Sequence, residues 1–570
     1  MAMKTDEISF KDPIVDLFYP TAEKRAQLKK RRVVLESYPQ DYVANLELER
    51  VAELICPHYQ YRILRMFGEM CCDEEVIAYR CDILEDFLEH PALAETVRKV
   101  IEVIVQNDRR SIYGLNEPDS FTKLDSAIEA FDAFVKAIDI MHDFYEKHGG
   151  KFKSAGVKKL FDCFEQHHAD KSFATLKKEL EQLKQALKDR IRSVTVGINL
   201  DERLVPVSAG IVDYSNQPYT LKPSLFDKII YHGAKFPEKN VVKSLKTKYA
   251  DNEYGEEKLV NTADEELFKE LSSLTDDYIR RINKVMAQYQ KIGFEEMFGL
   301  DYQLEYYLGA VKLIELCRSA GMGMCRPKIL PAGERRADMK GLYDLVYFSE
   351  SRLWNLRHKD EQKSVVPNDI ELGEETGFYL LTGANNGGKT TFIRGLGICY
   401  ALAQLGMYVP AESCELSPAD FIFTHFPKEE QTGINTSRFT TEIKEFKTIS
   451  DAITDRSLLL MNESIQSTTP QECVEIAEEL VRIFCIIGVR GVFATHLTDL
   501  AEKCDELNAD KRLRSKTASI VVCADEKTGE RLYKIKRGLP QKTSCAYSVF
   551  KQFGIDIDAV AERAAKHEKD

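Results

Sequence analysis

Residues 383–390, Gly-Ala-Asn-Asn-Gly-Gly-Lys-Thr, have the composition and order of a phosphate-binding loop. The apolar run 378–381 before them predicts a buried strand, and the stretch after them predicts a long helix closed by Gly406. Glycines let backbone N–H groups turn toward phosphate oxygens, and a helix N-terminus adds partial positive charge. Lys389 would reach the β- and γ-phosphates of ATP, and Thr390 would ligate Mg²⁺. The residues expected to bind the nucleotide are Gly383, Ala384, Asn385, Asn386, Gly387, Gly388, Lys389, Thr390 and Thr391.

Two further apolar runs predict strands that end beside polar groups. The first ends in Asn462 and Glu463, where P-loop ATPases usually place an aspartate for Mg²⁺ and then a glutamate that orients the attacking water. Asn462 can accept a hydrogen bond from metal-bound water but lacks the charge that holds a hard cation, so we expect slow hydrolysis. The second ends at His496, at the carboxyl edge where it can sense the γ-phosphate. We expect Glu463 and His496 to be catalytic and Thr390 and Asn462 to hold Mg²⁺, although each could instead be structural.

Length and composition bound the remaining possibilities. A chain of 570 residues predicts two to four domains. With 44% apolar and 30% charged residues, and no apolar stretch of membrane-spanning length or signal peptide, we expect a cytoplasmic protein without a membrane span. The 14 cysteines lack zinc-ligand spacing, which indicates reduced core thiols. The net charge of −13 argues against a coat of nucleic acid but allows a local basic face.

The first half of the chain has apolar residues at helical spacing from about residue 41 to residue 187. Within 158–193 the apolar positions form one narrow stripe, and a similar stripe follows a capping-box pattern at Thr262 and Glu265. Two long helices of this kind would hold the segment between them, 194–261, away from the body of the protein. We expect two lever helices and a small insert at their tip.

The insert begins with a pattern typical of a β-hairpin, with strands at 194–200 and 204–212. Its second part, 222–248, contains seven lysines against Asp227 and Glu238. This local positive charge indicates either a surface that contacts phosphates or a solvated lysine-rich loop.

After Gly321 short apolar runs bounded by glycine alternate with helical patterns, which predicts an α/β domain with a mostly parallel sheet. A hairpin at 518–523 and 531–536 and helices reaching Asp570 are expected to follow. The fold class is therefore a multidomain α plus α/β protein, with a helical part ahead of an ABC-type P-loop ATPase domain. The expected domains are 1–157, helical core; 158–193 and 262–300, levers; 194–261, clamp-like insert; 301–325, core helix and linker; 326–554, ATPase; and 555–570, C-terminal helix.

The segment TGANNGGKTTFIRGLGICYALAQLGMYVPAE, residues 382–412, resembles the MutS family, whose P-loop GPNxGGKST is followed by a helix ending in GxYVPA. The similarity continues through Ile-Phe-Thr at 422–424, Ser-Arg-Phe-Thr-Thr-Glu at 437–442, which resembles the family's STFMxE, and Phe-Ala-Thr-His at 493–496. It covers about residues 341–554. The helical half matches only in layout, because MutS proteins also carry a helical core, two levers and a DNA-contacting clamp.

The resemblance implies a homodimer in which Ser437 of one subunit approaches the γ-phosphate bound by the other. Closing the dimer around ATP would move the levers, so that the nucleotide controls the grip of the clamp on DNA. The candidate DNA contacts are the insert lysines Lys235, Lys239, Lys243, Lys246 and Lys248.

Some residues depart from the family pattern. Asn462 replaces the usual aspartate, His425 stands where arginine is frequent, and Val365 occupies a position where a phenylalanine commonly stacks on adenine. We expect no mismatch-reading domain, since there is no room for one before the helical core, and no nuclease-type extension after the ATPase half. The adenine preference is therefore less firmly predicted than phosphate binding.

Three functions are compatible with these features. The leading hypothesis is an ATP-dependent, DNA-binding dimeric clamp that acts in repair or recombination without a mismatch-reading wedge. The alternative is a slowly hydrolysing, nucleotide-switched binding module for a protein or a structured RNA. A generic ABC-type ATPase of chromosomes fits less well, because the segment after the P-loop resembles MutS.

Overall fold

The computed structural model describes residues 15–115, 120–188, 193–200, 202–203, 206–215, 249–251, 257–259, 299–383, 387–426, 438–466, 468–524 and 531–540. Its contacts divide the chain into two compact units. The first unit is formed by Met1–Arg98, His148–Asp162 and Gly299–Asp570, and the second by Lys99–Lys147 and Cys163–Phe298. None of the described helices is both long and apolar enough to cross a membrane.

A six-stranded sheet lies in the first unit, in the order β10-β11-β12-β8-β13-β14. All neighbours are parallel except β14, which pairs with β13 in the antiparallel direction. The strands are β8 (Phe378–Thr382), β10 (Ile422–His425), β11 (Leu458–Asn462), β12 (Arg490–Ala494), β13 (Thr517–Ala524) and β14 (Arg531–Arg537). Every residue of β8, β10, β11 and β12 is buried, as expected for parallel strands covered on both faces. The predicted parallel sheet and the predicted C-terminal hairpin are therefore confirmed.

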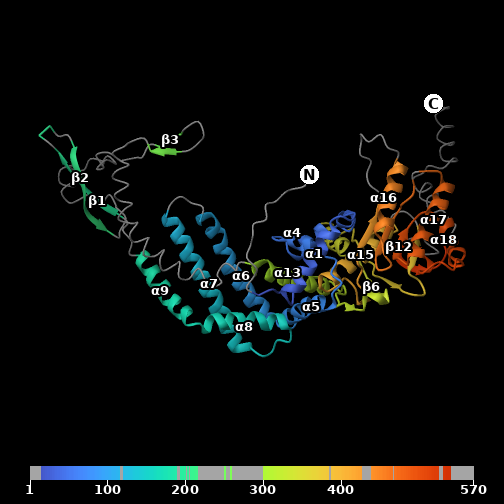
Figure 1. The fold of residues 1–570 in the computed structure, drawn as a ribbon, viewed down its shortest axis with the longest axis horizontal. Coiled ribbons are helices and arrows are strands. Elements are labelled where there is room, and N and C mark those ends of the chain that lie inside the picture. Colours follow the sequence, from blue (N-terminus) through green and yellow to red (C-terminus); the bar gives the residue numbers. More distant parts are fainter. Residues whose placement is uncertain are drawn as a thin grey trace. The chain divides into compact units, whose positions relative to one another are not determined.

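Helices connect the parallel strands, because a parallel pair needs a crossover connection. They are α15 (Lys389–Leu405), α16 (Arg438–Ala452), α17 (Pro470–Ile487), α18 (Thr498–Glu502) and α19 (Cys504–Asn508). Figure 1 shows these elements in orange and red around β12. The alternation brings the carboxyl ends of β8, β10, β11 and β12 to one edge of the sheet.

A second, four-stranded sheet has the order β5-β9-β6-β7. It is formed by β5 (Lys328–Ile329), β6 (Ala337–Leu342), β7 (Asn368–Leu372) and β9 (Ser413–Leu416), and the same region contains η1 (Ala332–Glu334), α13 (Asp301–Ser319) and α14 (Leu345–Arg357). Asp344 caps α14 by accepting hydrogen bonds from the backbone of Val346 and Tyr347. Every cysteine in the described part of the chain is a free thiol, as the cysteine spacing predicts.

The N-terminal helices of the first unit pack against the helix that follows the P-loop. They are α1 (Ala22–Leu35), α2 (Asp41–Asn45), α3 (Leu48–Ile55), α4 (Gln60–Phe67) and α5 (Glu74–Glu89). Both α4 and α5 contact α15, which lies beside them in Figure 1. Arg394 on α15 forms ion pairs with Glu47, just before α3, and with Asp344, just before α14. The nucleotide-binding helix is thus bonded to the helical part of the chain.

Arg80 on α5 is fully buried against the C-terminal end of α15. Its Nε donates to the carbonyl oxygen of Phe18 at 2.8 Å, and one terminal nitrogen donates to the carbonyl oxygen of Leu405 at 3.2 Å. The other terminal nitrogen lies 3.4 Å from a carboxylate oxygen of Glu69. The guanidinium therefore satisfies acceptors from three segments, one of which is the last turn of α15.

Replacing Arg80 with methionine should lower the free energy of unfolding by about 3–5 kcal/mol, because the buried Glu69 carboxylate and two carbonyls would lose their donor. Urea denaturation of the full chain measures this loss. Arg50→Met is the matched control: this half-exposed arginine pairs with Glu47 and Glu350, and its removal should cost under about 1 kcal/mol. Equal effects of the two substitutions would contradict the assignment.

The second unit is helical where it is described. Its helices, which partly continue from the first unit, are α6 (Pro91–Leu115), α7 (Ser120–His148), α8 (Ala155–Ala169) and α9 (Lys171–Lys188). Ion pairs join α9 to α7, with Lys177 Nζ lying 2.7 Å from Asp139 and Lys184 bonded to Asp132. The helical character predicted for 41–187 is confirmed by α2 to α9.

The lever and insert region is only partly described. The expected first lever, 158–193, is not one helix: α8 ends at Ala169 and α9 begins at Lys171, because Asp170 interrupts the helical pattern as aspartate commonly does at a helix start. The hairpin predicted at the start of the insert is present as antiparallel β1 (Ser193–Leu200) and β2 (Pro206–Ser215), and β3 (Tyr249–Asp251) pairs with β4 (Glu257–Leu259). The second lever to residue 298, the five insert lysines and the C-terminal helix 555–570 lie outside the described residues, so the domain limits stay predictions.

Candidate nucleotide-binding and hydrolysis site

The predicted phosphate-binding loop connects β8 to α15 in the expected order of strand, loop and helix. Gly388 is the N-cap of α15 with φ of 88°, a left-handed conformation that favours glycine. The first backbone N–H groups of this 17-residue helix have no partner within the helix and carry its positive dipole end. The arrangement suits a phosphate group. Ala384, Asn385 and Asn386 lie outside the described residues.

Lys389 is the first residue of α15, and only 4% of it is exposed. Its Nζ donates a hydrogen bond to the carbonyl oxygen of Gly383 at 3.0 Å, so the ammonium lies under the loop. Burial lowers the pKa of Lys389, and the negative charge of Glu463 partly offsets this effect. An ammonium group that is costly to bury gains from a phosphate beside it, so the residues that are present fit a nucleotide triphosphate.

Thr390 and Asn462 meet as the predicted Mg²⁺ ligands would require. The hydroxyl of Thr390 donates to Oδ1 of Asn462 at 3.2 Å, which joins the exposed start of α15 to the buried end of β11. A hydroxyl and an amide oxygen are hard ligands of the kind that Mg²⁺ accepts, but neither carries a charge. The pair fits a Mg²⁺ ion held mainly by its waters and by the phosphates. Thr391, the third residue of α15, is half-buried.

Substituting aspartate for Asn462 should lower the Mg²⁺ concentration needed for half-maximal ATP turnover by about tenfold, since a carboxylate binds the ion more strongly than an amide. Without Mg²⁺ the same substitution should lower the melting temperature, because Asn462 is 5% exposed and a carboxylate there would be buried without a cation. A Mg²⁺ titration of turnover and thermal unfolding with and without Mg²⁺ measure both effects. An unchanged Mg²⁺ dependence would remove Asn462 from the proposed metal ligands.

The two expected catalytic residues are in contact. Glu463 follows β11 and His496 follows β12, and Nε2 of His496 lies 2.8 Å from Oε1 of Glu463. Glu463 has a left-handed backbone with φ of 48°, and its N–H donates to the carbonyl oxygen of Ala494 at 2.8 Å. About a third of each side chain is exposed, so both reach solvent. A carboxylate oriented by an imidazole and open to water is suited to activate a water molecule.

Tyr533 is a residue near the P-loop that the motif analysis missed. A Cβ placed on Gly388 would lie 3.3 Å from Cδ1 of Tyr533, so the aromatic ring lies against the loop. The carbonyl oxygen of Tyr533 accepts a hydrogen bond from Nδ2 of Asn368 at 3.1 Å, and Oδ1 of Asn368 accepts one from the N–H of Ile535 at 2.8 Å. The segment beside Val365 thus fixes β14 next to the phosphate-binding loop. No local pattern marks Tyr533, because it reaches the loop through strand pairing.

Ser437 lies outside the described residues, one position before α16 begins at Arg438. His425, the residue at the position where arginine is frequent, is buried at the end of β10 and contacts neither Glu463 nor Lys389 in any described hydrogen bond. The structure therefore brings Gly383, Gly388, Lys389, Thr390, Asn462, Glu463 and His496 to one edge of the sheet.

Two family models match the chain: the MutS2 N-terminal domain matches residues 72–319, and MutS domain V matches residues 379–569. The DNA mismatch repair protein MutS of Fervidobacterium nodosum is 30% identical over 217 residues, which are 37% of this chain and 25% of that protein. The DNA mismatch repair protein MSH6 of Saccharomyces cerevisiae is 34% identical over 222 residues, 38% of this chain and 18% of that protein. Endonuclease MutS2 of Finegoldia magna is 31% identical over 208 residues, 36% of this chain and 26% of that protein. The chain thus spans about a quarter or less of the length of these relatives.

Proposed function

This chain belongs to the MutS family, and on that premise we propose that it is an ATPase whose nucleotide state controls its binding to DNA. The observation that carries the proposal is the contact of Glu463 with His496 at the sheet edge that also presents Lys389. The names of the relatives, two DNA mismatch repair proteins and an endonuclease, support DNA as the macromolecular ligand.

Each residue of the site has a defined task in ATP hydrolysis. Gly388, the first N–H groups of α15 and Lys389 bind the phosphates, and Thr390 and Asn462 hold Mg²⁺. When bound, Mg²⁺ neutralises phosphate charge. Glu463 orients the attacking water and accepts its proton as the bond from oxygen to the γ-phosphorus forms and the bond to ADP breaks. His496 keeps the Glu463 carboxylate in place by donating its Nε2–H. Tyr533 offers a face on which the base can stack.

We further propose that two copies complete the site, with Ser437 of one approaching the γ-phosphate bound by the other. The lysines of the insert would contact DNA phosphates, and the levers would carry the change between the two sites. The clamp would act on DNA structures in repair or recombination without a mismatch-reading wedge. The similarity of residues 382–412 to the family supports the dimer, and the lysine excess supports the DNA contact.

Asn462 favours a second candidate function. An uncharged ligand for Mg²⁺ slows hydrolysis, and a protein that keeps ATP bound can serve as a nucleotide-controlled binding module for a protein or a structured RNA. The two candidates differ in whether nucleic acid accelerates turnover.

The test is ATP turnover of the full chain alone and with duplex DNA, branched DNA and structured RNA. We expect DNA to stimulate turnover, and alanine at the five insert lysines to weaken DNA binding and flatten its dependence on salt by up to about 0.9 log units per lost contact. Tight ATP binding without turnover, together with binding to RNA alone, would favour the second candidate. Unchanged DNA affinity and salt dependence in the lysine variants would contradict the clamp.

A further inference from the structure

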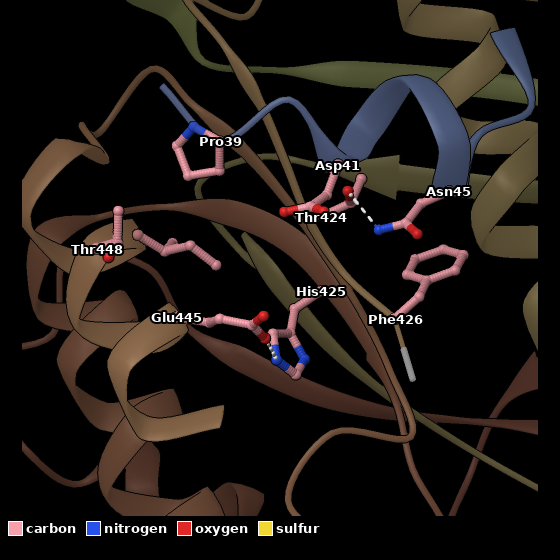
Figure 2. Close-up of a pocket in the computed structure, with 9 residues that line it drawn as sticks. Pro39, Asp41, Asn45, Thr424, His425, Phe426, Glu445 and Thr448 are labelled. Carbon is pink, nitrogen blue, oxygen red and sulfur yellow. Dashed lines mark hydrogen bonds and ion pairs between the residues drawn. The ribbon is translucent and has the colours of Figure 1, made fainter. Parts of the chain in front are cut away.

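His425, at the end of β10, joins two elements that the nucleotide site needs. Its Nδ1 lies 2.7 Å from Oγ of Ser464, in the loop after β11, and its Nε2 lies 3.1 Å from Oε2 of Glu445 on α16. The ring also stacks on Phe446 of α16, with ring centroids 4.3 Å apart. Figure 2 shows the imidazole facing Glu445 across this junction. One buried side chain thus bridges a helix and a loop.

Ser464 directly follows Glu463 and is held twice by His425. Its Oγ donates to the carbonyl oxygen of His425 at 3.2 Å, so the same oxygen accepts from Nδ1–H of the ring. On either side of Ser464, Glu463 and Ile465 have left-handed backbones with φ of 48° and 59°. Such conformations cost about 1–3 kcal/mol each in residues other than glycine, so they persist only where contacts hold them. His425 supplies two of these contacts.

Packing alone does not fix the ring. His425 borders a cavity of about 220 Å³ between the ends of α2 and β10 and the side of α16. Figure 2 shows the cavity walls formed by Asp41, Thr424 and Thr448 beside the imidazole. With open space on one side, the position of the ring depends on its polar contacts with Ser464 and Glu445 and on the stacking with Phe446.

We propose that His425 is a positioning residue that ties the left-handed turn at Glu463–Ile465 to α16, so that a shift of α16 moves the carboxylate that faces His496. The proposal rests on the proposed ATPase function, because Glu463 is its catalytic base. It assigns a task to the histidine that stands where the family often has arginine. Arginine has a longer side chain with a fixed fork of donors, whereas imidazole places one nitrogen toward each element.

The test uses the full chain with His425→Ala, His425→Asn and His425→Gln. The amide nitrogen of asparagine takes the place of Nδ1 and can still donate to Ser464, whereas that of glutamine takes the place of Nε2 and can only reach Glu445. The first measurement is amide hydrogen exchange of residues 462–466 without nucleotide. His425→Ala and His425→Gln should speed this exchange at least about tenfold, and His425→Asn should keep it within about threefold of the parent.

The second measurement separates ATP binding from turnover. The alanine variant should lower kcat about 10- to 100-fold and change the Kd for ATP less than about twofold, because the phosphate contacts are on α15. Ser464→Ala should lower kcat similarly, and the double variant should lose little more, since both changes break one chain of contacts. Asparagine should recover most of kcat.

Asn45→Ala is the matched control. Asn45 lines the same cavity and donates to Oγ1 of Thr424 at 2.9 Å, one residue before His425, but it touches neither Ser464 nor Glu445 in any described contact. Exchange of 462–466 that is unchanged in His425→Ala, or that rises equally in Asn45→Ala, would overturn the proposal. If the parent protein bound ATP but did not hydrolyse it, the proposed function would fail, while the exchange measurement would still decide the role of His425.

Discussion

Replacing Lys389 with methionine should weaken ATP binding at least about 100-fold and remove turnover, because the buried ammonium is the charged group placed under the phosphate-binding loop. Methionine has a similar length without the charge, so the loss would report the phosphate interaction rather than a cavity. Equilibrium binding of ATP to the full chain, with and without Mg²⁺, measures the effect.

The stability of the nucleotide-free protein is the control. Burial lowers the pKa of Lys389 below its ordinary value of 10.5, so the charged group destabilises the empty site, and Lys389→Met should be as stable as the parent or more stable. Between the lowered pKa and 10.5 the unfolded chain binds more protons than the folded one, so the stability of the parent gains on the variant as the pH rises through that window. A variant that loses ATP only because it unfolds, or one that binds ATP normally, would contradict the assignment.

The nucleotide site could be predicted because its parts are local in sequence. Gly388 and Lys389 lie where a strand passes directly into a helix, and residue types alone identify that turn. The expectation that Glu463 and His496 share an edge followed from parallel strands, whose carboxyl ends coincide, and the 2.8 Å contact confirms their proximity. Their catalytic tasks stay predictions.

Contacts between segments far apart in the chain could not be predicted in this way. Arg80 looks like any charged residue of a helix, yet it is fully buried and bonded to the carbonyl of Leu405. Tyr533 reaches Gly388 only because β14 pairs with β13 next to β8. Likewise the link from His425 to Glu445 depends on how α16 packs after a segment whose pattern gives no direction. Periodicity shows which face of an element is buried but not which partner covers it.

Glu463→Gln should lower the rate of ATP hydrolysis about 100- to 1000-fold while leaving ATP bound at least as tightly as in the parent. Glutamine has the shape of glutamate and can still accept the hydrogen bond from His496, but it cannot accept the proton of the attacking water. It also removes the negative charge that faces Lys389, which favours phosphate at that position. A single-turnover measurement with saturating ATP separates the chemical step from nucleotide exchange.

A loss of turnover in Glu463→Gln can be assigned to chemistry because this substitution should barely alter the fold. About a third of the Glu463 side chain is exposed, and the left-handed backbone of this residue is held by its N–H bond to Ala494 and by the neighbouring Ser464, neither of which involves the carboxylate. The melting temperature should therefore match the parent within a few degrees, which corresponds to less than about 1 kcal/mol. His496→Asn completes the comparison: it removes the group that orients the carboxylate but leaves the base, so hydrolysis should fall less than in Glu463→Gln. Hydrolysis that survives in Glu463→Gln above about a tenth of the parental rate would mean that another group activates the water.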